Sequence, residues 1–220
     1  RLTTVSPPSA HGIQTPELGA GLDGLVRERS AVVSGILNGV DDAVWDPAHD
    51  ALVAAHFSAT RLAGKAECKA ALQRECGLDV QDSAPLFTAV SRLTEQKGLQ
   101  LVAGAVDGMA DRGAQLVVLG SGDAVISQAL RNYAEQYPGR VAVHLGYDEV
   151  LSHRITAGID LFLMPSRFEP CGLNQMYSQR YGTPPIVSAT GGLVDSVTDA
   201  SETALAQHQA SGIVFDDMSA

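Results

Sequence analysis

Leu86-Phe87-Thr88-Ala89-Val90 is a short, continuous apolar run, and it begins the pattern that decides the fold. The residues that follow at 97–112 have helical spacing, and a second apolar run, Gln115 to Leu119 (QLVVL), comes next. Continuous apolar strands that alternate with helices of roughly ten to fifteen residues are typical of parallel strands covered on both faces. The sequence therefore predicts an α/β fold, a Rossmann-like doubly wound parallel sheet with right-handed crossovers and helices on both faces.

The same alternation continues to the end of the chain. Further strands are expected at 141–145, 160–164, 185–188 and 212–215, and further helices at 62–76, 124–136, 148–157 and 172–181. In the helix at 97–112, the spacing places Leu101, Ala105 and Met109 on one face. Residues 1–30 are rich in Pro, Ser and Gly and are expected to be irregular.

The composition argues against several classes of partner and site. The chain carries 15 Lys and Arg against 25 Asp and Glu, a net charge of −10. Neutralising phosphates needs a basic face, so neither a nucleic acid nor an anionic membrane is an expected partner. The three cysteines lack the spacing of a disulfide framework or a zinc site, which favours a reducing cytoplasm. No apolar run reaches the roughly 18 residues of a spanning helix, and a start at Arg1 rather than Met suggests a fragment.

The loops that follow the strands hold the candidate site residues, because ligands of doubly wound sheets bind beyond the carboxyl ends of the strands. Ser91-Arg92 to Lys97-Gly98 follows one strand and opens a helix. Arg supplies a rigid fork of donors and Lys a point charge, so Arg92 and Lys97 together suit a diphosphate. Taken by itself, the segment favours the alternative interpretation, an exposed loop with two surface cations.

Two further strand ends carry weaker signals. Gly120-Ser121-Gly122 would let a ligand approach the backbone, or would simply turn the chain from strand to helix. Val125 stands where a dinucleotide fingerprint needs its third Gly, so that fingerprint fails. Tyr147 could stack on a purine, or could be half-buried core.

The most informative segment is Pro165-Ser166-Arg167-Phe168-Glu169-Pro170-Cys171-Gly172-Leu173-Asn174. Its carboxylate, Glu169, could bind sugar hydroxyls or face a cationic transition state. The amides of 171–174 would lie at the positive end of a helix dipole, ready for a phosphate or a hydroxyl. The alternative is an acidic residue that stabilises its own helix. Gly191-Gly192 likewise exposes amides to an anion or makes a turn.

In order and spacing, these motifs resemble bacterial glycogen synthases and plant starch synthases, along nearly the whole chain. Further stretches contribute to the resemblance, namely Ile36-Leu37-Asn38-Gly39-Val40-Asp41, Trp45-Asp46-Pro47 and Tyr181-Gly182-Thr183. It implies the two-Rossmann glycosyltransferase-B architecture, with the active site in the cleft between two domains. Residues 1–30 would be the tail of the N-terminal acceptor domain. Residues 31–220 would be the C-terminal nucleotide-sugar-binding domain, truncated at its C-terminus.

The resemblance also implies residue roles. Arg92 and Lys97 would hold the diphosphate, Tyr147 would pack on adenine, and Glu169 would bind the donor glucose. The other positions assigned to donor binding are Asn38, Gln96, Gly120, Gly122, Cys171, Gly172, Leu173, Asn174, Gly191 and Gly192. One departure from the family pattern is Ser9-Ala10-His11-Gly12-Ile13, in place of Tyr-Ala-x-Glu-Ile. Tyr177 stands where related transferases have the second acid of a Glu-x7-Glu motif, and in this it resembles the bacterial branch.

The function implied is retaining transfer of glucose from ADP-glucose to the 4-hydroxyl of an α-1,4-glucan, in the cytoplasm or, for a plant protein, in a plastid. No cofactor or metal is expected, because the sequence has no Asp-x-Asp motif. The N-terminal domain is an implied partner, and the fragment alone is expected to be inactive. Alternatives are a non-catalytic ADP or ADP-glucose module, a sucrose or trehalose-phosphate synthase, and a nicotinamide dehydrogenase, which the failed fingerprint disfavours.

Overall fold

A computed structural model of the chain describes residues 1–216 and contains two separate sheets. The larger sheet has six strands in the order β5-β4-β3-β6-β7-β8, and every neighbouring pair is parallel. The strands are β3 (Leu86–Val90), β4 (Gln115–Gly120), β5 (Val141–Leu145), β6 (Leu161–Met164), β7 (Pro185–Ser188) and β8 (Ile213–Phe215). This confirms the predicted doubly wound parallel sheet and all six of its strands.

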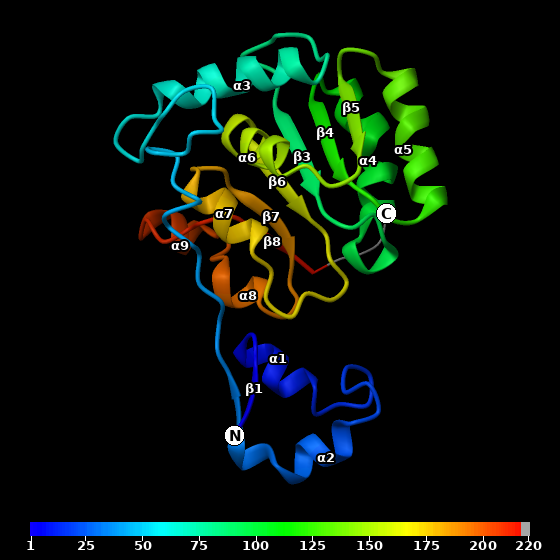
Figure 1. Cartoon of the computed structure of the whole chain (residues 1–220), viewed down its shortest axis with the longest axis vertical. Helices are drawn as coiled ribbons and strands as arrows, with labels where there is room; N and C mark the ends of the chain where they lie inside the picture. Colours follow the sequence, from blue (N-terminus) through cyan, green and yellow to red (C-terminus); the bar gives the residue numbers. More distant parts are fainter. Residues whose placement is uncertain (217–220) are drawn as a thin grey trace.

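Helices cover both faces of this sheet (Figure 1). On one face α4 (Leu99–Asp111) and α5 (Ala124–Gln136) pack on alternate residues of β4, Leu116 and Val118. On the other face α3 (Ala63–Glu75) and α6 (Glu149–Gly158) pack over Val117 and Leu119. All six positions of β4 are buried, which is why its sequence is a continuous apolar run rather than an alternation.

The buried face of α4 differs from the face that the spacing selects. Leu99, Val102, Ala103 and Val106 are buried, whereas Ala105 is exposed. Because α4 has apolar residues around most of its circumference, periodicity identifies the helix but not the side that meets the sheet.

The first 35 residues form a small unit with a sheet of its own, which lies at one end of the molecule (Figure 1). In it β1 (Leu2–Thr4) pairs in parallel with β2 (Val33–Gly35). Along the chain, the two strands are connected by α1 (Pro7–Gly12), α2 (Asp23–Glu28) and η1 (Ser30–Val32). The prediction of irregular structure for residues 1–30 is therefore wrong. Ser6 accepts a hydrogen bond from the Ser9 amide and Pro7 is the first helical residue, so the Ser-Pro-Pro that resembles a turn is a helix start.

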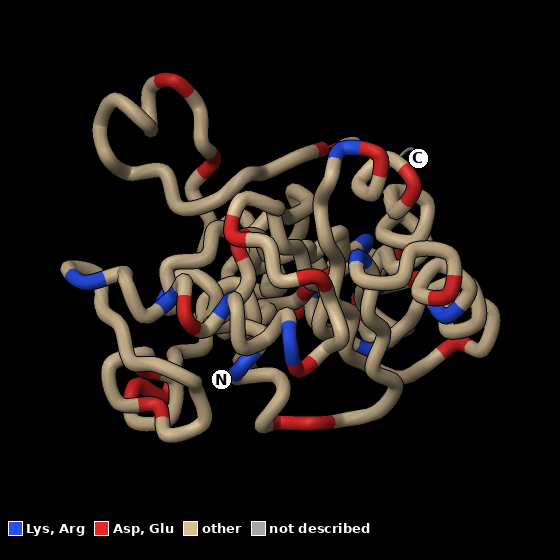
Figure 2. Tube along the Cα trace, turned by 90° about the horizontal axis from the view of Figure 1, so that it is seen from above, with Lys and Arg blue, Asp and Glu red and all other residues tan. Residues whose placement is uncertain are grey.

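The remaining elements are η2 (Glu95–Lys97), α7 (Asn174–Arg180), α8 (Leu193–Ser196) and α9 (Glu202–Ala206). The chain moves outward from β3 to β4 and β5 and then returns to β6, on the other side of β3. This reversal is the topological switch point, and the loops after β3 and β6 meet there. Figure 2 shows Asp and Glu on segments all round the trace, so the negative charge is not confined to one face.

Candidate functional site

Two adjoining hollows open at the switch point. The first, which we call the switch-point cavity, has a volume of about 290 Å³ and is lined by residues that include Lys97, Ser166, Glu169, Gly172 and Leu173. The second, which we call the Tyr147 cavity, has a volume of about 420 Å³ and is lined by residues that include Trp45, Arg92, Gly120, Tyr147 and Tyr177. Val90, Ser91 and Asn174 line both, so the two hollows form one continuous surface.

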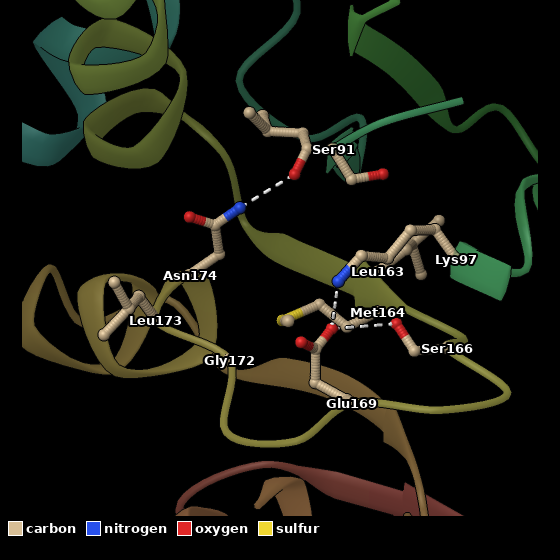
Figure 3. Close-up of a pocket in the computed structure, with 10 residues that line it drawn as sticks. Ser91, Lys97, Leu163, Met164, Ser166, Glu169, Gly172, Leu173 and Asn174 are labelled. Carbon is tan, nitrogen blue, oxygen red and sulfur yellow. Dashed lines mark hydrogen bonds and ion pairs between the residues drawn. The ribbon is translucent and has the colours of Figure 1, made fainter. Parts of the chain in front are cut away.

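An ion pair crosses the switch-point cavity (Figure 3). The Nζ of Lys97, at the end of η2, lies 2.5 Å from the Oε2 of Glu169, in the loop after β6. The hydroxyl of Ser166 donates to the same Oε2 at 3.2 Å. Glu169 is buried, with 6% of its surface exposed, so the nearby ammonium offsets the cost of removing the carboxylate from water. Because both bonds end on Oε2, Oε1 is the carboxylate oxygen left for a ligand.

Two glycines pack closely against the backbone of the loop that carries Glu169. Gly98 has φ +70, and a Cβ there would lie 1.8 Å from the carbonyl oxygen of Pro165. Gly191 has φ +48, and its Cβ would lie 1.9 Å from the carbonyl oxygen of Glu169, which also accepts a hydrogen bond of 3.0 Å from the Gly192 amide. Both glycines combine a left-handed backbone with a close approach that no other residue permits. Their part in the site is to fix the loop, since neither glycine lines the switch-point cavity or the Tyr147 cavity.

The Tyr147 cavity combines a cation with aromatic side chains. Arg92 follows β3 and Tyr147 follows β5, two strands that are separated by β4, and Tyr147 is 87% exposed. Asn174 donates from Nδ2 to the carbonyl of Val90 at 2.7 Å, which ties the start of α7 to the end of β3 between the two cavities. A nucleoside diphosphate offers the matching features, an aromatic base for Tyr147 and phosphates for Arg92.

Residues 77–217 match the family described as glycosyl transferases group 1. The chain belongs to this family. The chain is 57% identical over 220 residues to glycogen synthase of Leptothrix cholodnii, covering 100% of this chain and 45% of that protein. Glycogen synthase of Nitrosomonas europaea is 53% identical over 220 residues, again with 100% of this chain and 44% of the relative covered.

The catalytic domain of starch synthase IV from Arabidopsis thaliana, solved with ADP and acarbose, has the same architecture. It superimposes with a TM-score of 0.92 at 40% identity, over 99% of this chain and 45% of that chain. This glycosyl transferase chain thus spans less than half the length of the proteins it matches. It has the glycosyltransferase-B type of domain that its sequence predicts.

Several predicted site residues of this glycosyl transferase chain lie behind the cavities rather than in their walls. The side-chain amide of Gln96 donates from Nε2 to the backbone carbonyl of Phe168 at 3.3 Å. The backbone carbonyl of Gln96 accepts from the backbone amide of Arg167 at 2.9 Å. Cys171 is buried, and Gly122 approaches the backbone of Leu93. These residues support the loops that carry Lys97 and Glu169.

Asn38, another predicted site residue, lies outside both cavities. It is exposed in the connection between the small unit and the larger domain. Its proposed place in a cleft wall would therefore depend on the other half of the enzyme, and it stays a prediction.

Sequence reasoning assigned Tyr147 to the base but gave no place in the site to two other aromatic residues, Trp45 and Tyr177. Both line the Tyr147 cavity, although the resemblance includes Trp45-Asp46-Pro47 only as a motif without a role. The ring partners of Trp45, Tyr177 and His153, lie more than 100 residues away in the sequence, so no local spacing announces the contact.

Between residues 1 and 216, no three or more His, Cys, Asp or Glu side chains are placed to share a metal ion. Within the same residues, every helix is too short or too polar to cross a bilayer.

Proposed function

We propose that this chain is the donor-binding half of an α-1,4-glucan synthase that takes glucose from ADP-glucose and retains the anomeric configuration. The observation that carries the proposal is the 57% identity to a glycogen synthase over the full length of the chain. The ADP in the starch synthase IV structure supports an adenine nucleotide as the carrier of the sugar.

In this proposal the two cations of the site bind the diphosphate. Arg92 lines one cavity and Lys97 the other, so a diphosphate that crosses from the Tyr147 cavity to the switch-point cavity meets both in turn. As the bond between glucose and phosphate breaks, negative charge grows on the leaving ADP. Fixed cations stabilise that charge in the transition state more than in the bound substrate, which lowers the barrier.

Glu169 would hold the glucose through hydroxyl groups of the sugar ring. Its Oε2 is already occupied by Lys97 and Ser166, which fixes the plane of the carboxylate before a ligand arrives. Oε1 can then accept from a sugar hydroxyl without rearrangement. The acceptor 4-hydroxyl would attack from the face that ADP leaves, which is how retention arises.

The acceptor glucan and the other wall of the cleft would come from a second domain of the same polypeptide. The chain spans 45% of the Leptothrix glycogen synthase, and the remaining part of such a protein is large enough for that domain. We place the boundary after Gly35 rather than after residue 30, because β2 pairs with β1. By itself the 220-residue chain would bind nucleotide without turnover.

Calorimetric titration of the chain with ADP, and then with UDP, tests the donor assignment. ADP is expected to bind more tightly than UDP, and Arg92→Ala is expected to weaken ADP binding by about tenfold, the loss of one charge-assisted contact. Arg131→Ala, an exposed cation on α5, is the matched control. If neither the chain nor the two-domain polypeptide binds ADP, the proposal is wrong.

A further inference from the structure

Three rings are stacked at the edge of the Tyr147 cavity. The centroid of Trp45 lies 3.8 Å from that of His153, at an interplanar angle of 15°, and 4.0 Å from that of Tyr177, at 4°. Trp45 is therefore sandwiched, and Tyr177 is the outer ring of the stack. Of these three residues, Trp45 and Tyr177 line the cavity and His153 is buried behind them.

A buried carboxylate fixes the inner end of this stack. Asp50 is 6% exposed, and its Oδ2 accepts from Nδ1 of His153 at 2.7 Å and from the hydroxyl of Tyr181 at 2.6 Å. His153 and Tyr181 are 1% and 0% exposed. Bonds to a buried charge are stronger than neutral ones, so His153 is held in one orientation and sets the plane of Trp45.

The same cavity is also lined by Tyr147 and Arg92. Tyr147 follows β5 and is 87% exposed, while Tyr177 lies on α7 and is half-buried. A hollow of about 420 Å³ between these aromatic residues is within the range that small ligands occupy. Its arrangement of rings with a cation suits a ligand that has a flat aromatic end and an anionic end.

We propose that Tyr177 contacts the nucleoside part of the donor and that Trp45 is a positioning residue that holds Tyr177 in place. This inference rests on the proposed function and adds two residues to its nucleotide site. The Tyr177 ring would be presented to the ligand already oriented, so binding loses little conformational entropy. Burial, and then the charge of Asp41, raise the pKa of the Tyr177 hydroxyl, which keeps it a neutral hydrogen-bonding group.

Titration of the chain with ADP tests the two roles, with two readouts. Calorimetry gives the Kd of each variant, and the fluorescence of Trp45, the only tryptophan in the chain, reports on its surroundings. Tyr177→Ala and Trp45→Ala are each expected to weaken ADP binding by about tenfold, the order of loss of an aromatic stacking surface. Tyr177→Phe and Trp45→Phe keep a ring in the stack and are expected to stay within about threefold of the parent.

Tyr133→Ala is the matched control, because Tyr133 is also half-buried and stacked on another ring, Tyr137, but lies on α5 away from both cavities. In the two-domain enzyme, Tyr177→Ala is expected to raise KM for ADP-glucose while kcat changes little, since the nucleoside is held equally in the ground state and the transition state. Unchanged ADP affinity in Tyr177→Ala, an equal loss in Tyr133→Ala, or a fall in kcat at constant KM would each overturn the inference. Failure of the parent chain and of the two-domain enzyme to bind ADP would instead overturn the proposed function, and this inference with it.

Discussion

Lys97 and Glu169 are separated by 72 positions in the sequence, yet their side chains form an ion pair of 2.5 Å across the switch point of the sheet. The pair exists because β3 and β6 are neighbours, so the loops that follow them meet. The site therefore has a defined arrangement before any ligand enters. A bound diphosphate would meet a Lys97 ammonium that Glu169 already holds in place.

Lys97→Ala is expected to reduce kcat/KM of the two-domain enzyme by about 10²–10³-fold, the usual loss when one fixed donor to developing charge is removed. It also removes the cation that faces the buried Glu169, so the unfolding temperature should fall as well. Glucose transfer from ADP-glucose, measured together with thermal unfolding, separates the two effects. Arg131→Ala serves as the control, and wild-type turnover in Lys97→Ala would contradict the assignment.

Gly98→Ala is expected to destabilise the chain, because the new Cβ would lie 1.8 Å from the Pro165 carbonyl on a backbone of φ +70. A left-handed conformation alone costs a non-glycine residue about 1–2 kcal/mol, and the clash adds to it. Gly104→Ala is the matched control on the same helix region, since a Cβ there meets nothing within 4 Å. That change should instead stabilise α4 by about 0.5–1 kcal/mol. Urea unfolding of the two variants checks the opposite signs.

The sequence predicts the strands well because burial of both faces leaves a direct mark in it. LFTAV at 86–90 and QLVVL at 115–119 are continuous apolar runs for that reason. The buried face of α4 could not be predicted, because apolar side chains surround that helix and only the position of the sheet selects Val102 and Val106.

The same contrast holds for the site. Lys97 and Glu169 follow strand ends, where a doubly wound sheet gathers its ligand contacts, so topology alone points to them. Trp45 lies in a connection without regular structure, and its role depends on side chains from α6 and α7. Contacts of this kind follow from tertiary packing, so the sequence can mark Trp45 without showing which rings it meets.

Asp50→Ala is expected to lower the free energy of unfolding by about 3 kcal/mol, because His153 and Tyr181 would each lose a charged partner in a buried place. Asp123 is the matched control, since it also accepts two hydrogen bonds but is exposed at the start of α5. Asp123→Ala should cost only about 1 kcal/mol, the value of a helix cap. Equal losses in the two variants, by urea unfolding, would show that the Asp50 cluster adds nothing beyond an ordinary surface carboxylate.

Lys65 makes the stability of the chain depend on pH above neutrality. Burial lowers the pKa of its ammonium from 10.5 to about 8, although Nζ donates to Thr183 at 2.6 Å and to the Ala157 carbonyl at 3.1 Å. Between pH 8 and pH 10.5 the folded chain therefore holds this site neutral while the unfolded chain holds it charged. The unfolded state binds more protons in that window, so this site's contribution to the free energy of unfolding rises with pH.

The comparison of the parent chain with Lys65→Met isolates that contribution, because Met is an unbranched side chain one atom shorter than Lys and cannot titrate. The difference in the free energy of unfolding, parent minus variant, should increase from pH 7.5 to pH 9.5 by at most about 1.4 kcal/mol per pH unit. All other titrating groups are common to both proteins and cancel in the difference. A difference that stays constant or falls over this range, in urea unfolding at fixed ionic strength, would mean that Lys65 keeps its proton in the folded chain and that its hydrogen bonds outweigh its burial.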